Sequence, residues 1–398
     1  MNANKLIRYP CLPIIALAVS GCTVTSKTTK APAGQADAQP NEILQGVQGY
    51  LVQPGDAKGS ILGGRPKSGT RIVAMSLPTK KEKTIHTLQR GPITHNLSGP
   101  DESGRVAYIE DYFFVADAEK RHLLKCVSLK GDKETTIFTK PGSAMWATSA
   151  VQTSDGHGVV GTYLTLASRG GNVALLSKIN SRQMPGALLN EGRLEIWNLD
   201  QKKTVEIADI KALNQPMAWF PEGNQLAYVK LTPIKQIPEK GAGSELLGSY
   251  LDRKWEDAPA IFSLDLNTGK SAFLAVGWQP AISPDGKTLI VTGSKKLYSV
   301  DLTTGKATDL DLPKVAYRTW DPAPVVVGIA VDGTVFHRGL PLTGRKARTT
   351  TGNSPLVGRK PMLTVRAANP ATGKFVVVIP YFDPRHRISF GIPAKAPE

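Results

Sequence analysis

A repeated pattern of short strands and tight turns is the strongest constraint on the fold. Residues 278–310 contain candidate strands at 278–282, 288–292, 297–302 and 307–310, separated by turns at 283–287, 293–296 and 303–306. In the first of these turns, Pro284 fixes the backbone φ angle and Gly286 supplies the positive φ that closes the turn. The segment therefore predicts a four-stranded antiparallel meander.

The same plan recurs along the chain and is marked by two kinds of anchor residue. Residues 215–230 repeat the strand, turn and strand of 278–292, and residues 261–270 repeat the third strand and the turn after it. Glycines stand in the turn after the first strand, at Gly104, Gly156, Gly223, Gly286, Gly333 and Gly373. Leucines end the third strand, at Leu77, Leu129, Leu199, Leu266, Leu302 and Leu340. Six copies of each anchor predict an all-β fold, a six-bladed β-propeller of four-stranded antiparallel blades.

The two anchor series fail to match only at the ends of the chain. Leu77 has no turn glycine before it, and Gly373 has no third strand after it. We therefore expect N-terminal strands within about 70–88 and C-terminal strands within about 361–380 to share the closing blade, two from each end. A ring closed in this way has no exposed sheet edge. The pattern also leaves open another all-β arrangement, such as two sandwiches.

The composition agrees with a globular β protein. The 398 residues include 38 Gly and 29 Pro, which favours many tight turns and short strands. With 41% hydrophobic and 21% charged residues, the chain is not disordered, a coiled coil or a multi-span membrane protein. The formal net charge of +16 favours anionic partners without choosing among them.

The turn sequences carry a resemblance to a known family. The run 278–287, Trp-Gln-Pro-Ala-Ile-Ser-Pro-Asp-Gly-Lys, and the pair Asp-Leu-Asn-Thr-Gly-Lys at 265–270 and Asp-Leu-Thr-Thr-Gly-Lys at 301–306 resemble TolB-type propeller repeats, which are relatives of WD repeats. The resemblance spans about 70–380. It implies a TolB-like β-propeller that acts mostly as an interaction platform, although a few such propellers are enzymes or accessory domains of peptidases.

Residues 1–21 have the features of a secretory signal. Lys5 and Arg8 precede an apolar run at 11–19, which is too short to cross a membrane as a helix. The sequence Val-Ser-Gly-Cys at 19–22 resembles the bacterial lipobox, which implies lipidation of Cys22 and cleavage before it. Thr23 after the cysteine implies, in a Gram-negative host, transfer to the outer membrane. An ordinary secretory signal followed by an incidental cysteine is the alternative.

These features divide the chain into three parts. We expect a lipoprotein signal peptide at 1–21, a flexible tether at 22–46 and the propeller at 47–398. Cleavage and lipidation leave Cys126 as the remaining cysteine, so the mature chain forms no internal disulfide. Its apolar neighbours favour a buried position for Cys126 over a reactive thiol.

Two insertions are expected on one face of the propeller. They lie at about 168–192 and 232–259, each after the second strand of a blade. The second contains a possible helix with Ser244 as its N-cap. Its candidate partner-binding residues are Leu246, Leu247, Tyr250, Leu251 and Trp255. A lid that covers the propeller mouth without binding a partner is the alternative.

A run of basic residues marks a second candidate surface. Between 338 and 366 there is no Asp or Glu, and the basic residues are Arg338, Arg345, Lys346, Arg348, Arg359, Lys360 and Arg366. Arginine binds phosphate and carboxylate groups through paired hydrogen bonds, so this patch could hold an anionic lipid, an acidic glycan or an acidic protein. A solvated basic face without a ligand is the alternative.

Catalytic and metal-binding motifs are lacking in the sequence. The histidines are scattered without metal-ligand spacing, and no nucleophile elbow or phosphate-binding loop occurs. Asp155, Asp285 and Asp332 stand in turns, where a carboxylate caps backbone N–H groups. We therefore expect no enzyme activity, no metal and no cofactor.

Together these features predict an outer-membrane-anchored lipoprotein of the cell envelope whose propeller is a protein-interaction scaffold. Its expected partners are an envelope protein complex and an anionic glycan or lipid, and the exported address disfavours nucleic acid. Two alternatives stay open. One is a propeller lyase or hydrolase acting on acidic polysaccharide or peptide, and the other is a polysaccharide-binding lipoprotein that uses Tyr250 and Trp255.

Overall fold

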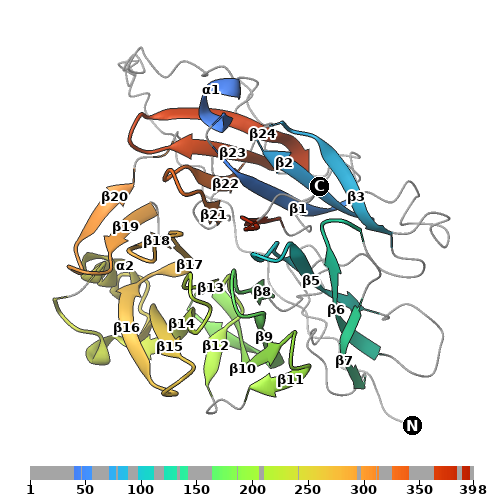
Figure 1. The fold of residues 1–398 in the computed structure, drawn as a ribbon. Coiled ribbons are helices and arrows are strands. Elements are labelled where there is room, and N and C mark those ends of the chain that lie inside the picture. Colours follow the sequence, from blue (N-terminus) through green and yellow to red (C-terminus); the bar gives the residue numbers. More distant parts are fainter. Residues whose placement is uncertain are drawn as a thin grey trace, which may run out of the picture. The chain divides into compact units, whose positions relative to one another are not determined.

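Antiparallel β-sheets make up most of the chain that the structure describes (Figure 1). This computed structural model describes residues 40–45, 47–55, 71–77, 79–87, 97–111, 121–131, 135–141, 164–185, 187–205, 210–240, 242–293, 297–310, 312, 325–339, 363–382 and 388–394. All of them belong to the unit Ala36–Glu398. Within these residues there are six sheets, which we number I to VI along the chain.

The first three sheets contain the following strands, in hydrogen-bonded order. Sheet I holds β25 (Ser389–Gly391), β1 (Gly49–Gly55), β2 (Arg71–Leu77) and β3 (Glu82–Thr87). Sheet II holds β4 (Leu97–Ser98), β5 (Arg105–Asp111), β6 (Arg121–Ser128) and β7 (Thr135–Pro141). Sheet III holds β8 (Thr165–Leu166), β9 (Asn172–Met184), β10 (Ala187–Asn198) and β11 (Lys203–Val205), and β12 (Lys211–Leu213) also pairs with β10.

The last three sheets follow the chain in order. Sheet IV holds β13 (Ala218–Trp219), β14 (Gln225–Pro233), β15 (Asp257–Asp265) and β16 (Ser271–Val276). Sheet V holds β17 (Trp278–Ile282), β18 (Thr288–Thr292), β19 (Leu297–Asp301) and β20 (Ala307–Leu310). Sheet VI holds β21 (Val325–Ile329), β22 (Val335–Gly339), β23 (Leu363–Asn369) and β24 (Lys374–Phe382).

Local turn chemistry explains why sheet V forms where the sequence predicts it. The Asp285 carboxylate accepts a hydrogen bond from the Lys287 backbone N–H at 3.0 Å, and Gly286 has a φ of 70°. In the next hairpin turn, the Asp301 carboxylate accepts from the N–H groups of Thr303 and Thr304, both at 2.8 Å. These carboxylates satisfy backbone donors that no strand pairs, so the turns are fixed by their own residues.

Apolar clusters between neighbouring sheets join the series into a ring. Each of six clusters contains buried residues of two adjacent sheets: Ile72 with Val106 (I and II), Leu124 with Trp197 (II and III), Leu176 with Leu226 (III and IV), Val229 with Leu289 (IV and V), Ile290 with Val335 (V and VI), and Phe336 with Leu51 (VI and I). Because sheet VI packs on sheet I, the series closes on itself, and the fold is an all-β propeller of four-stranded antiparallel blades.

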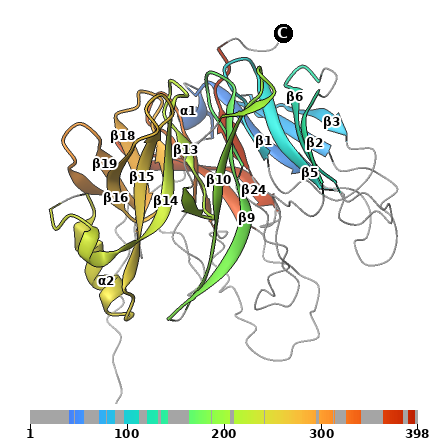
Figure 2. The ribbon, with the colours of Figure 1, turned by 90° about the horizontal axis from the view of Figure 1, so that it is seen from below.

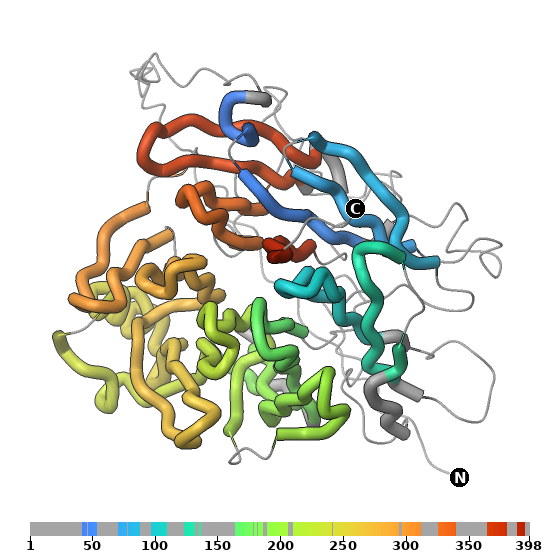
Figure 3. The backbone as a smooth tube through the Cα atoms, viewed as in Figure 1, coloured from blue at the N-terminus to red at the C-terminus, as the bar shows by residue number. Residues whose placement is uncertain are grey.

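The closing sheet is shared by both ends of the chain, as the sequence predicts, but its strands divide differently. Sheet I takes three strands from the N-terminal side and only β25 from the C-terminal side. Figure 3 shows the dark red β25 beside the blue β1. The expected pairing of two strands from each end is wrong because β23 and β24 complete sheet VI. Gly373 lies in the turn between these two strands, and Leu340 follows β22, the second strand of its sheet.

Residues 168–192, expected to form an insertion, are strands of sheet III. The turn after the first strand of this sheet contains Gly170 and Gly171. Gly156, which was expected there, lies outside the described residues. β9 and β10 then form a long hairpin, paired from Ala187–Met184 to Asn198–Asn172. The extra length therefore extends the sheet instead of forming a separate loop.

The insertion expected at 232–259 is present. Between β14 and β15 the chain forms η2 (Ile234–Gln236), η3 (Ser244–Leu246) and α2 (Leu247–Leu251). Ser244 is not an N-cap, because Gly243 caps η3 and no side chain caps α2. Figure 2 shows α2 and the tip of the β9–β10 hairpin on the same side of the sheets, and α1 on the opposite side.

The folded body begins before the expected end of the tether. α1 (Pro40–Leu44) places Ile43 and Leu44 in the apolar cluster between sheets VI and I, and Val47 joins them. These side chains are no more than 7% exposed. The segment at 40–47 is therefore part of the propeller core and not of a tether.

Candidate functional site

A cavity of about 220 Å³ lies where the innermost strands of the sheets meet. Residues of β4, β8, β13, β17, β21 and β25 line it, so every sheet contributes its first strand in hydrogen-bonded order. The cavity is therefore the axial channel of the propeller. Its walls belong to the sheets themselves, which makes it a preformed site.

The cavity wall is mostly apolar. Its larger apolar side chains are Leu97, Leu164, Leu166, Met217, Trp219, Ile282, Val325, Val327, Ile388 and Phe390. Small polar groups come from Ser98, Thr165 and Ser389, and Arg338 is the one charged side chain among the described lining residues. Such a wall suits an apolar group accompanied by a negative charge or a hydrogen-bond acceptor.

Hydrogen bonds between neighbouring sheets hold the cavity wall in place. The Trp219 indole N–H donates to the Thr165 carbonyl at 3.0 Å, which joins sheets III and IV. The Ser98 hydroxyl accepts from the Leu166 N–H at 2.9 Å, joining sheets II and III. The Ser389 hydroxyl accepts from the Gly99 N–H at 3.1 Å and so ties the C-terminal strand to sheet II. These bonds fix the first strands relative to one another.

The closing strand fits the wall without space for a larger residue. A Cβ atom added to Gly391 would lie 2.0 Å from the Pro100 carbonyl oxygen. A Cβ on Gly328 would lie 2.7 Å from the Phe390 side chain, and the Phe390 ring stacks on Phe336 with centroids 4.6 Å apart. Glycine is required at both positions because backbone and ring approach so closely.

A buried pair of a histidine and an arginine lies one residue from the cavity wall. His337 on β22 is paired in register with Arg366 on β23, and both side chains are fully buried. Burial, together with the Arg366 charge, lowers the pKa of His337 to about 3. His337 is therefore neutral near pH 7, and Arg366 is no part of an exposed patch.

The basic surface predicted from the sequence is only partly described. Arg338 lines the axial cavity, and Arg366 is buried between sheets, because β22 and β23 alternate their side chains between the two faces of sheet VI. The remaining members, Arg345, Lys346, Arg348, Arg359 and Lys360, lie outside the described residues. The structure therefore brings one predicted basic residue, Arg338, to the candidate site.

The insertion uses its apolar residues internally. Leu246, Tyr250 and Trp255 are at most 6% exposed in the cluster between sheets IV and V, and Leu247 packs against them. Burial raises the pKa of Tyr250 to about 12. Leu251 is the exception, with 57% of its surface exposed. The expectation that all five residues face a partner is wrong, because the apolar helical spacing serves packing.

The insertion also anchors the long hairpin of sheet III. The Trp255 indole N–H donates to the Pro185 carbonyl at 2.7 Å, and Met184 belongs to the same apolar cluster. Arg182 on β9 forms an ion pair with Asp257 at the start of β15. None of the described insertion residues lines the axial cavity. The insertion therefore braces sheets III and IV.

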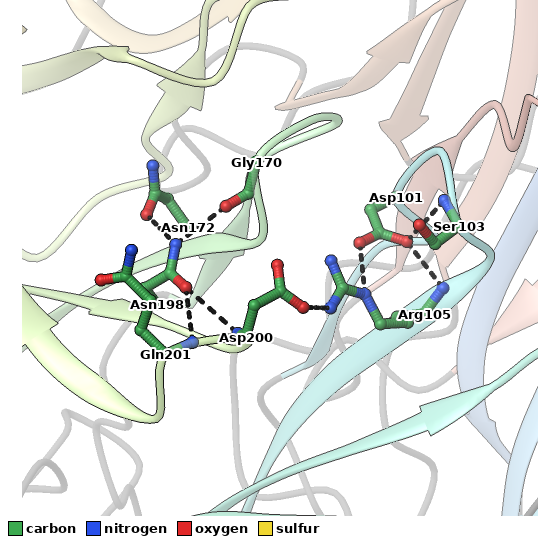
Figure 4. A network of polar contacts seen from close by, with 8 residues as sticks. All are labelled: Asp101, Ser103, Arg105, Gly170, Asn172, Asn198, Asp200 and Gln201. Carbon is green, nitrogen blue, oxygen red and sulfur yellow. Dashed lines mark hydrogen bonds and ion pairs between the residues drawn. The ribbon is translucent and has the colours of Figure 1, made fainter.

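A polar network joins sheets II and III at their turns (Figure 4). The Arg105 guanidinium donates to the Asp101 carboxylate at 2.8 Å and also pairs with Asp200. Burial alone would lower the pKa of Arg105, but hydrogen bonds with Asp200 and Asp101 outweigh it and raise that pKa. The Asn198 side chain donates to the Gly170 carbonyl at 2.8 Å. All these groups satisfy one another, so the network is a structural clamp.

The turn aspartates cap backbone groups, as expected. The carboxylate of Asp285 accepts from Lys287 and that of Asp332 from the Thr334 N–H, both at 3.0 Å, and Asp155 lies outside the described residues. Of the histidines, His86 packs beside Tyr108 with ring centroids 5.9 Å apart. Within the described part of the chain, no three His, Cys, Asp or Glu side chains gather as metal ligands. No helix found there is long and apolar enough to cross a membrane.

Sequence reasoning missed the residues of the cavity wall. A signal for them was available, since the short segments before Gly104, Gly223, Gly286 and Gly333 are the first strands of their sheets. The segments 97–100, 216–219 and 280–282 all precede such turns and all line the cavity. Their apolar side chains were interpreted as ordinary strand residues.

Comparisons with known proteins give similarities at low identity. No protein-family model and no curated protein matches the chain. It is 11% identical to a chain from a crystal structure of the nidogen/laminin complex, over 87% of this chain and 100% of that one, with a TM-score of 0.49. It is 13% identical to TolB from Acinetobacter baumannii, over 83% of this chain and 69% of that one, with a TM-score of 0.43. It is 12% identical to an oligogalacturonate lyase from Vibrio parahaemolyticus, over 68% of each chain, with a TM-score of 0.44. The assignment of the propeller fold rests on the chain's own sheets, on the apolar clusters between them and on the cavity at their axis.

Proposed function

We propose that the chain is a lipid-anchored protein of the bacterial cell envelope whose six-bladed β-propeller, with sheet I as the closing blade, binds a partner protein at its axial cavity. The observation that carries this proposal is the preformed cavity, to which the first strand of every sheet contributes. A scaffold needs such a rigid concave surface, because its binding then costs little ordering of the protein.

The lining chemistry supports a partner segment that is apolar and carries a carboxylate. The side chains of Trp219, Ile282 and Val325 offer an apolar surface, and Arg338 lies at the same wall. Arginine binds carboxylates through two parallel hydrogen bonds, which would orient the segment in the cavity. The excess of positive charge on the chain would also speed the approach of an acidic partner.

The membrane anchor rests on the sequence. Residues 1–39 lie outside the described residues, so lipidation of Cys22, the signal at 1–21 and an outer-membrane location remain proposals. They are supported by the basic start, the short apolar run and the lipobox resemblance. Metabolic labelling with a radioactive fatty acid tests the anchor, since a Cys22→Ser variant should lose the label.

The partner site is tested by affinity capture from crosslinked cell envelopes with two variants. Val325 pairs in register with Arg338, so Val325→Glu would place a carboxylate beside that arginine and compete with an acidic partner. Leu251→Glu changes the exposed tip of the insertion and serves as the control. Thermal melting would verify that both variants fold. We expect a defined set of partner proteins with the wild type and Leu251→Glu, and its loss with Val325→Glu.

The other outcomes decide between the alternatives. Loss of the partner set with Leu251→Glu alone would move the binding surface to the insertion. Absence of any partner protein with the wild type would contradict the scaffold proposal. Acidic glycans would then be the candidate ligands of a polysaccharide-binding lipoprotein, or the candidate substrates of a propeller lyase or hydrolase.

A further inference from the structure

A lysine lies in the turn between the third and fourth strands of every sheet or, in sheet VI, at the first residue of the fourth strand. These outer-turn lysines are Lys80, Lys130, Lys202, Lys270, Lys306 and Lys374. All are exposed except Lys80, which is half-buried. The fourth strand is the outermost strand of each sheet, so these turns lie at the periphery of the propeller. The lysines therefore mark a basic rim.

The outer turns all emerge on one side of the molecule. Because strands alternate in direction, the turns after the first and third strands share a side, and the insertion between β14 and β15 lies on the other. Figure 2 shows α2, which belongs to the insertion, on one side of the sheets and α1 on the other. α1 lies beside the outer turn of sheet VI, because its Glu42 pairs with Lys374. The outer-turn lysines thus occupy the side that lacks the insertion.

The chain also enters the propeller at this rim. Gly49, the first residue of β1, pairs with Leu77, which directly precedes the outer turn of sheet I. In α1, the Glu42 carboxylate pairs with the Lys374 ammonium at 3.1 Å, in the outer turn of sheet VI. Any segment that precedes α1 is therefore attached at the basic rim.

Two outer-turn lysines occupy a backbone conformation that favours glycine. Lys80 and Lys202 have φ angles of 55° and 51°, whereas the equivalent residues of sheets IV and V are Gly269 and Gly305, with φ angles of 66° and 70°. A Cβ atom destabilises the left-handed conformation, so lysine stands here at a cost to folding. Sheets I and III thus carry a charge at a turn position where sheets IV and V have glycine.

Three acidic residues in the described parts of the outer turns are engaged within the protein. The carboxylates of Asp265 and Asp301 each accept two backbone N–H groups of their own turns, at 2.8 to 3.0 Å, and Asp200 pairs with Arg105. Among the described residues, no carboxylate forms an ion pair with the side chain of Lys202 or Lys306. The ammonium groups of Lys202 and Lys306 are therefore available to an external anion.

We propose that this basic rim rests on the anionic headgroups of a phospholipid membrane, with the insertion side facing away. A ring of lysines at the periphery of one side fits a flat anionic surface, to which each lysine contributes separately. The proposal gives an orientation to the anchored propeller, but headgroup binding does not itself require lipid on Cys22. The two can therefore fail independently.

The test compares lysines that share a conformation and differ in position. Lys254 also has a positive φ, 59°, and is exposed, but it follows α2 on the insertion side. Full chains with Cys22→Ser in every sample would be sedimented with vesicles of phosphatidylethanolamine and phosphatidylglycerol, and with vesicles of phosphatidylcholine alone. The variants are Lys202→Gly, the pair Lys80→Gly with Lys202→Gly, and the control Lys254→Gly.

We expect binding to the anionic vesicles to fall about fivefold with Lys202→Gly and roughly 20-fold with the pair, and to stay unchanged with Lys254→Gly. Each variant should melt no lower than the wild type, because glycine suits these positions, so lost binding cannot come from unfolding. An equal loss with Lys254→Gly would reduce the effect to net charge and overturn the proposal. Wild-type binding that is absent, or equal on neutral vesicles, would also overturn it.

Discussion

His337 is the residue whose chemistry departs furthest from that of the free side chain. Within the described part of the chain, neither ring nitrogen has a hydrogen-bond partner. Burial and the neighbouring Arg366 lower its pKa from 6.5 to about 3. A histidine that stays neutral in the folded state down to about pH 3 cannot act as an acid near neutral pH. Its effect falls instead on stability.

Acidification should weaken the protein through His337. Because its folded pKa is depressed, the unfolded chain binds more protons between pH 6.5 and about 3, and stability is lost as the pH falls through this window. At pH 5 the free energy of unfolding should be about 2 kcal/mol lower than at pH 7 from this group alone. Urea unfolding at both pH values checks this, with His337→Leu as the control.

The leucine variant removes the titrating group and keeps an apolar side chain in the site. Its stability should therefore change less between pH 7 and pH 5 than that of the wild type, by about the same 2 kcal/mol. Equal pH dependence of the two proteins would show that folding does not lower the pKa of His337.

At the scale of elements, turns of neighbouring sheets fit against each other. Gly223, in the first turn of sheet IV, has a φ of 73°, and an added Cβ would lie 2.1 Å from the Arg169 carbonyl oxygen in the first turn of sheet III. Gly269, in an outer turn, has a φ of 66° and no neighbour within 4 Å of an added Cβ. The first glycine thus serves contact between sheets, and the second serves only its own turn.

Alanine substitutions at Gly269 and Gly223 should separate the cost of a Cβ in left-handed backbone from the cost of a clash between neighbouring sheets. Gly269→Ala should lower the free energy of unfolding by about 1 to 2 kcal/mol, the cost of a Cβ in left-handed backbone. Gly223→Ala adds a clash with a neighbouring backbone, so we expect a loss at least about 2 kcal/mol larger. Urea denaturation of both variants measures the difference. Equal losses would mean that the turn of sheet III moves aside freely.

The elements differ in how well their sequences predict them. Sheet V was predicted almost to the residue, because its turns carry their own Asp caps and glycines. The closing sheet was mispredicted although a signal was present. The sequence Thr-Gly-Lys at 372–374 matches the outer turns at 268–270 and 304–306, so Gly373 belongs between a third and a fourth strand. The long hairpin of sheet III was predicted as an insertion. No turn residue in its sequence indicates that β9 and β10 stay paired over their full length.

At the scale of the whole molecule, the candidate site depends on closure of the ring. The cavity could not be predicted from any one segment, because its wall combines strands as far apart in sequence as β4 and β25. The sequence indicates which segments are first strands, but only the ring places them around one axis. Arg338 reaches the cavity from β22, the second strand of sheet VI. No sequence motif marks a residue of a second strand as part of the cavity wall.

Removal of the closing strand should therefore open the ring. A chain that ends at residue 387 lacks β25, its pairing with β1 and the stacking of Phe390 on Phe336. We expect its melting temperature to fall by roughly 10 °C or more, since several kcal/mol of burial and strand pairing are lost. A chain that ends at residue 394 retains β25 and is the control. Similar melting of both truncated chains would show that β25 does not hold the ring closed.

The pairing of Val52 with Ser389 also sets an order on synthesis. Among the described strands, β25, which closes the propeller, is synthesised after all the others, whereas its partner β1 is synthesised before them. Sheets II to VI can form as they emerge, but β1 keeps an unpaired edge until β25 is synthesised. An incomplete chain exposes this edge to proteases and to other chains. Ring closure therefore waits for β25, which follows every other strand of the propeller in the sequence.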